Sequence, residues 1–134
     1  MGVKFKQKSK EINYKLLKSY KLYQLLTLLK IFKTLKLSKI SLILYLLDND
    51  LELNDLNKSE ILSFSNYLPI KIIEFSLNND LIIFKRKSFK LSEKGELFYK
   101  KLEKEKIFSE VVLKVKKYKQ HNKIINDYIK EMGD

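Results

Sequence analysis

The chain has 134 residues, of which 45% are hydrophobic, with three Gly, one Pro and no Cys. This length suits one domain with a sizeable core, and a chain without Cys forms no disulfide, thiol nucleophile or cysteine-bound zinc site. The formal net charge of +12 favours a nucleic-acid partner. However, Arg86 is the only Arg, and Arg is the side chain best suited to bidentate contacts with guanine or phosphate.

The sequence predicts neither a membrane span nor a secretory signal. The longest apolar run, residues 40–47, is interrupted by Ser41 and is too short to cross a bilayer. The basic residues at the start of the chain are not followed by a compact apolar segment. We therefore expect a cytoplasmic protein that makes no membrane contact.

The first half of the chain predicts a tail and two helices. Residues 1–13 are expected to form a mobile basic tail, and residues 14–35 a first helix. The apolar residues of this helix recur at helical spacing: Leu22, Leu25, Leu26, Leu29 and Phe32. A second helix, from Lys39 to Leu47, is apolar on most sides, and Ser38 is a candidate cap for its start.

Motifs that carry catalysis or bind cofactors are largely absent from the sequence. The glycines stand alone, so no Gly-rich phosphate loop exists, and His121 is the single His. Asp48-x-Asp50-x-Glu52 resembles the start of a calcium loop, but Leu53 occupies the position that requires Gly. We therefore expect a protein that is not an enzyme, with no catalytic residues, no metal and no cofactor.

The middle of the chain predicts a helix, a basic hairpin and another helix. Pro69 suits the first turn of a third helix that ends at Leu77. Strands are expected from Leu81 to Phe84 and from Phe89 to Leu91, joined by the basic turn Lys85-Arg86-Lys87-Ser88. Ser92 is a good N-cap for a fourth helix that reaches Lys104, and Gly95 lets this helix approach the hairpin closely.

This order of elements is the pattern of a winged-helix domain, in which the hairpin forms the wing. The fold class we expect is mostly α: helices plus a two-stranded β-hairpin wing, with a long C-terminal helix. The winged-helix domain would cover residues 14–104, and residues 105–134 would form a C-terminal interaction helix. The expected core includes Leu22, Leu25, Leu29, Ile83 and Leu97.

The third helix does not have the composition of a DNA-reading helix. Such a helix lies in the major groove and offers polar or basic side chains to the nucleobases. Here Lys71 is the only basic residue, and its charge is balanced by that of Glu74. Ile70 and Ile73 favour a protein interface instead. The wing residues Lys85, Arg86, Lys87 and Lys90 are candidate phosphate contacts, which position a duplex but do not read it. We therefore expect at most weak, non-specific binding of duplex DNA.

The last helix, expected from Ile107 to Met132, carries apolar residues at heptad spacing. The a and d positions are Phe108, Val111, Val115, Tyr118, Asn122, Ile125, Ile129 and Met132. We expect these residues to form an interface with another chain, either a partner or a second copy in a homo-oligomer. A helix that packs along its own domain would use the same residues, because a period of 3.6 serves that purpose as well.

The run KLYQLLTLLKIFKTLKLSKISLILYLLDND, the hairpin, the segment LSEKGELFYKKL and the basic last helix together resemble a known family. They are similar to the small middle components of bacterial ABC-three-component systems, which include the Lamassu-type antiphage systems. The resemblance runs from about residue 18 to the end and departs at residues 50–68. It implies a non-catalytic adaptor subunit that links an SMC/Rad50-like ATPase to an effector subunit. The alternative is a winged-helix transcription regulator, MarR-like or PadR-like, that dimerises through its terminal helix.

Overall fold

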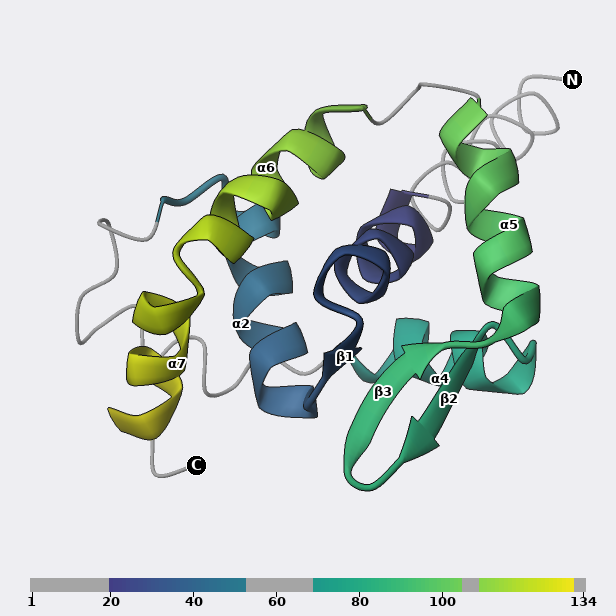
Figure 1. Ribbon diagram of the computed structural model, residues 1–134, viewed down its shortest axis with the longest axis horizontal. Coiled ribbons are helices and arrows are strands. Elements are labelled where there is room, and N and C mark those ends of the chain that lie inside the picture. The colour runs from purple at the N-terminus through teal and green to yellow at the C-terminus, as the bar shows by residue number, and fades with distance from the viewer. Residues whose placement is uncertain (1–19, 53–68, 105–108, 132–134) are drawn as a thin grey trace, which may run out of the picture.

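The computed structural model describes residues 20–52, 69–104 and 109–131 (Figure 1). It is mostly helical, with a small three-stranded antiparallel sheet. The expected tail at residues 1–13 and all but the first three residues of the departure at residues 50–68 lie outside the described residues. After helical residues 20–32, the elements are β1 (Thr34–Leu35), α2 (Leu37–Asp48), α4 (Ile70–Asn78), β2 (Ile82–Lys85), β3 (Ser88–Leu91), α5 (Glu93–Lys104), α6 (Ser109–Gln120) and α7 (Asn122–Glu131).

The helical residues 20–32 run through the middle of the structure (Figure 1). Every side chain from Leu22 to Leu29 is buried, including those of Gln24 and Thr27. A helix that is buried on all sides needs no polar face, which explains why its apolar residues exceed one stripe. The helix ends at Lys33, which adopts the left-handed conformation (φ 77°) that is usual for Gly at this position.

The second helix starts earlier than the sequence predicted. Its N-cap is Lys36, which makes no side-chain capping hydrogen bond, so the prediction that Ser38 caps this helix was wrong. Helix α2 instead gains its stability from burial, because seven of its twelve residues are buried. At its far end, Asp48 forms an ion pair with Lys21 of the central helix.

The sheet has the strand order β1-β3-β2, and both pairs are antiparallel. Leu35, Phe89 and Ile82 are buried and form its inner face. Thr34, Lys90 and Ile83 form one row on its outer face, because Lys90 is paired with both of the others. The side chain of Ile83 is therefore 41% exposed, and its predicted place in the core was wrong.

A set of short contacts joins the hairpin to α5. The Ser92 hydroxyl accepts a hydrogen bond from the Gly95 N–H at 2.9 Å and donates one to the Asp80 carbonyl. The Ser92 N–H donates to the Leu81 carbonyl at 3.1 Å. Ser92 therefore caps α5, as predicted, and also ties the helix start to the chain that enters β2.

Helix α5 packs on the central helix through Tyr99. The Tyr99 ring stacks on Tyr23 with 5.4 Å between ring centroids, and its hydroxyl oxygen accepts a hydrogen bond from Thr27 at 3.3 Å. This burial raises the pKa of Tyr99. Leu97, which points away from this contact, is 62% exposed, so its predicted place in the core was also wrong.

The last part of the chain forms two helices rather than the single helix that was predicted. Helix α6 ends at Gln120 and α7 begins at Asn122. At the break, the His121 N–H donates to the Tyr118 carbonyl at 3.0 Å, and the His121 carbonyl accepts from Ile124 and Ile125. Both helices contact α2, and Figure 1 shows them along one side of it.

Candidate functional site

The wing residues are exposed, and the turn that carries them is strained. Lys85, Arg86, Lys87 and Lys90 are all exposed. Lys85 and Ser88 are paired, so Arg86 and Lys87 form a two-residue turn. Their φ values are 53° and 64°, as a type I′ turn requires, although that turn normally uses Asn-Gly. Holding an L-residue in this conformation costs about 1 kcal/mol for each residue.

Helix α4 separates the two isoleucines that were predicted to form an interface. Ile70 is 48% exposed, whereas Ile73 is only 6% exposed and belongs to the core. The difference arises because Ile70 is the first residue of the helix and lies outside the core, whereas Ile73, one turn later, lies inside it. Ile73 is therefore a packing residue, and its predicted role in an interface was wrong. Lys71 and Glu74 are exposed beside Ile70.

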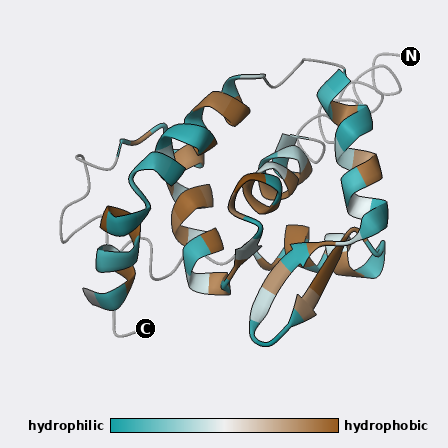
Figure 2. Ribbon diagram, in the orientation of Figure 1, coloured by the Kyte–Doolittle hydropathy of each residue, from teal (hydrophilic) through white to brown (hydrophobic). Residues whose placement is uncertain are grey.

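Large apolar side chains remain exposed on three neighbouring elements. Ile70 of α4, Phe84 of β2 and Leu97 of α5 are 48%, 56% and 62% exposed. We call these three residues the apolar set. Helix α4, strand β2 and the start of α5 meet at one end of the structure, and Figure 2 shows hydrophobic residues on all of them. The Phe84 ring also contacts the ring of Phe89, with 4.7 Å between their centroids.

The heptad residues of the C-terminal helices are mostly part of the chain's own core. Val111, Val115, Tyr118 and Ile125 are at most 5% exposed, because they pack against α2 and the rest of the core cluster. They are buried within the chain and so cannot form the expected seam with another chain in this arrangement. The intramolecular alternative is the one that the structure shows for these four residues.

Of the remaining heptad residues, two are half-buried within the chain and two are not described. The Asn122 side chain is half-buried and accepts a hydrogen bond from Lys39 of α2, so it has its partner inside the chain. Lys39 also lies 5.2 Å from the centre of the Phe32 ring, and burial lowers the pKa of its ammonium group. Ile129 is half-buried against the core. Phe108 and Met132 lie outside the described residues.

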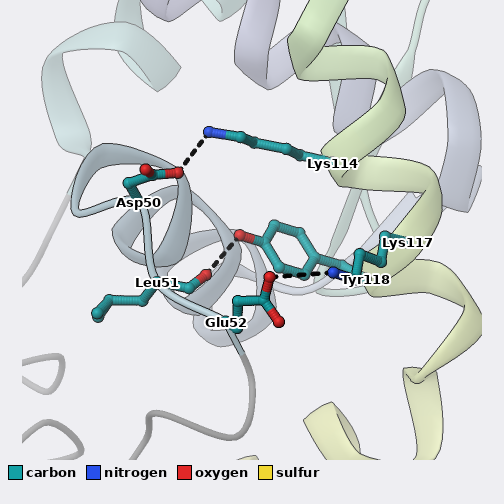
Figure 3. A network of polar contacts seen from close by, with 6 residues as sticks. All are labelled: Asp50, Leu51, Glu52, Lys114, Lys117 and Tyr118. Carbon is teal, nitrogen blue, oxygen red and sulfur yellow. Dashed lines mark hydrogen bonds and ion pairs between the residues drawn. The ribbon is translucent and has the colours of Figure 1, made fainter.

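A polar network holds the end of α2 against α6 (Figure 3). Lys114 pairs with Asp50 at 2.6 Å, Lys117 pairs with Glu52 at 3.0 Å, and the Tyr118 hydroxyl donates to the Leu51 carbonyl at 2.9 Å. The hydrogen bond from Lys114 holds the pKa of Asp50 below its ordinary value. Burial raises the pKa of Tyr118 to about 12. Residues 50–52, which follow α2, therefore contact α6 through two ion pairs and one hydrogen bond.

A cavity of about 300 Å³ opens beside this network. Its lining residues are Asp50, Leu51, Glu52, Lys114, Lys117, Tyr118, His121 and Ile124. The two carboxylates in the lining are both paired with lysines. Within the described ranges, no group of His, Cys, Asp and Glu side chains is arranged to hold a metal ion.

Sequence reasoning did not identify Lys36 as a neighbour of the wing or Phe84 and Leu97 as surface residues. The pairing of β1 with β3 brings residues 34–36 beside Lys90. The alternation of polar, apolar and polar residues in Thr34-Leu35-Lys36 is the signal of a strand, but it is only three residues long. Phe84 and Leu97 carry no such signal, since their exposure is decided by tertiary packing.

No protein-family model, curated protein sequence or solved structure matches this chain. None of the helices in the described ranges combines the length and the apolarity that are needed to cross a membrane.

Proposed function

We propose that this chain is a winged-helix protein that serves as a non-catalytic adaptor subunit of a bacterial antiphage complex. In this proposal it acts in the cytoplasm and links an SMC/Rad50-like ATPase to an effector subunit. The identity of these partners rests on the resemblance carried by residues 18 to the end of the chain. A winged-helix assignment is supported by the order of helix, β1, α2, α4, β2, basic turn, β3 and α5, and by the antiparallel sheet order β1-β3-β2.

The observation that carries the adaptor role is the exposure of the apolar set. Ile70, Phe84 and Leu97 are each about half exposed or more, and burying one such side chain is worth about 1.5–3 kcal/mol. Large apolar side chains that stay exposed on neighbouring elements are a common feature of protein-binding surfaces. In α4 the polar residues beside Ile70 are Lys71 and Glu74, whose charges cancel, so this helix is poorly suited to face DNA.

The second candidate function is a DNA-binding regulator, and the basic wing is the observation that favours it. In that alternative the protein would be a homodimer joined through its terminal helices. Four of the residues that would form such a seam, Val111, Val115, Tyr118 and Ile125, are instead buried within the chain. This burial removes the expected contact of the homodimer, whereas the adaptor can still use the exposed apolar set to bind a partner.

The adaptor role predicts that genes for an SMC/Rad50-like ATPase and an effector lie beside the gene for this chain, and co-expression with these two proteins tests it. We expect the chain to co-elute with a tagged ATPase in size-exclusion chromatography. The double variant Ile70→Ser/Leu97→Ser should lose co-elution, because both side chains would leave the interface. Leu113→Ser is the matched control, since Leu113 is 69% exposed but lies on α6.

A folded wild-type chain that elutes apart from the folded ATPase and effector would contradict the adaptor role. An equal loss of co-elution in the Leu113→Ser control would contradict the assignment of the apolar set as the interface. The regulator would gain support from tight binding to one operator that is lost when single bases are changed.

A further inference from the structure

We propose that the outer face of the sheet, together with the wing tip, binds the phosphate backbone of duplex nucleic acid without reading its sequence. This basic face consists of Lys36, Lys85 and Lys90, with Arg86 and Lys87 at the tip. It does not include the apolar set. The proposal therefore goes beyond the adaptor role, and either one can fail without the other.

The strand register places the three lysines on the same side of the sheet. Lys90 is paired with Ile83, and Lys85 lies two residues after Ile83, so their side chains leave the same face. Lys90 is also paired with Thr34. The backbone at Lys36 is extended (φ −78°, ψ 160°), so Lys36 continues the alternation of β1 and lies on the side of Thr34. All three lysines are exposed.

Among the described residues, no ion pair compensates the charges on this face. No Asp or Glu occurs from residue 33 to 47 or from 81 to 92. The ion pairs found among the described residues involve Lys21, Lys114 and Lys117, and none includes a lysine of the basic face. The fold thus brings together cations that repel one another, and a polyanion would relieve this repulsion.

The wing tip adds two cations in an unfavourable backbone conformation. Arg86 and Lys87 both have positive φ values, at 53° and 64°. An Asn-Gly turn would remove this strain, yet the chain has its only Arg here. The turn lies at the free end of the hairpin (Figure 1), where long cationic side chains can extend past the sheet towards a phosphate. Backbone strain of this kind clusters at functional sites such as ligand clamps.

The spacing and composition of the face fit a duplex better than a membrane surface. Adjacent strands lie about 4.8 Å apart, so Lys36 and Lys85, on either side of β3, are separated by about 10 Å. This span is smaller than the major groove, which is about 12 Å wide, so the lysines can follow one phosphate strand. The apolar residue in the outer row is Ile83, whereas surfaces that bind membranes pair cations with several inserted apolar side chains.

Fluorescence anisotropy with a labelled duplex of arbitrary sequence, at salt concentrations from about 50 to 200 mM, tests the proposal on the full chain alone. The variant Lys36→Gln/Lys90→Gln removes two charges from the basic face. Lys100→Gln/Lys104→Gln is the matched control, because it removes two exposed charges from α5. Circular dichroism should show the same helix content for both variants.

We expect the wild-type chain to bind A·T-rich and G·C-rich duplexes equally. In the face variant, the slope of log affinity against log salt should become shallower by about 1.8, which is 0.9 for each lost phosphate contact. The control should keep the wild-type slope. Equal slopes for the two variants would overturn the proposal, because the binding would then follow net charge alone. Tighter binding to phosphatidylserine vesicles than to the duplex would overturn it as well.

Discussion

The Leu81 carbonyl oxygen lies where a side chain at position 95 would begin: a Cβ added to Gly95 would be 1.9 Å from it. The carbonyl carbon of Leu81 would be 2.9 Å away. Since both atoms belong to the backbone, neither can move aside as a flexible side chain would. The close approach of the hairpin to α5, predicted from the sequence, is confirmed, and it depends on the absence of a side chain at this position.

Gly95→Ala should therefore destabilise the protein. The added methyl group would push α5 away from Leu81, and overpacking of this kind typically costs about 1–3 kcal/mol. Urea denaturation followed by circular dichroism measures the change in the free energy of unfolding. Lys100→Ala, at an exposed position of the same helix, is the control and should stay within about 0.5 kcal/mol of the wild type. Equal stability of Gly95→Ala and wild type would rule out the close approach.

A series of substitutions at Ser92 should separate the two hydrogen bonds of its hydroxyl group. Ser92→Thr keeps both bonds and should be close to wild type in stability. Ser92→Asp can still accept from Gly95 but cannot donate to the Asp80 carbonyl, so it should be intermediate. Ser92→Ala loses both and should cost about 1–2 kcal/mol. Thermal unfolding would give this order, and equal values for Ala and Thr would contradict it.

The wing turn should become more stable when its strain is removed. Arg86→Asn/Lys87→Gly supplies the residues that a type I′ turn prefers. It should raise the free energy of unfolding by about 1 kcal/mol, because the strain relieved at the two positions exceeds the entropy that the added Gly loses on folding. The double variant Arg86→Gln/Lys87→Gln removes the same charges but keeps the strain. A similar rise in melting temperature for both variants would show that charge repulsion, rather than backbone strain, destabilises the turn.

Substitutions on the two sides of α6 should have opposite consequences. Val115 is fully buried, whereas Leu113 is 69% exposed. Val115→Asp would place an unpaired charge in the core and should unfold the chain, and Leu113→Asp should leave its fold intact. Circular dichroism and light scattering of the isolated chain distinguish these outcomes. A folded Val115→Asp variant with a changed assembly state would show instead that Val115 lies in an interface with another chain.

Tyr118 should make stability sensitive to alkaline pH. Burial raises its pKa to about 12 in the folded chain, compared with about 10 in an unfolded chain. Its contribution is complete below pH 10, and it is lost as the pH rises from about 10 to 12, because the unfolded state releases its proton first. The stability difference between wild type and Tyr118→Phe should therefore shrink over this range. A difference that stays constant with pH would contradict the assigned pKa.

The sequence predicted the hairpin and the start of α5 well, because their determinants are local. The first expected strand was shifted by one residue from β2, the second lacked only the first residue of β3, and Ser92 has its predicted role as N-cap. Each of these features depends on residues a few positions apart. Helix α4 was also close to its prediction, since Pro69 fixes where the helix can begin.

Features that depend on distant partners were not predicted. Strand β1 has two residues and exists because β3 pairs with it. The break at His121 has no Gly or Pro to mark it in the sequence. A straight helix would continue in the direction of α6, whereas the break turns α7 so that Ile125 reaches the core. In the candidate site, the pattern of α4 showed excess apolar residues but not that Ile73 lies inside and Ile70 outside.

Because α6 and α7 pack on α2, the chain cannot be truncated between α5 and α6 without exposing its core. Val115 and Ile125 complete the same core cluster as Leu25 and Leu44. A truncation after Lys104 would uncover the side of α2 that these helices contact, and the exposed surface would favour aggregation. Residues on either side of position 104 therefore share one cooperative unfolding transition, and a fusion tag is better placed at an end of the chain than between α5 and α6.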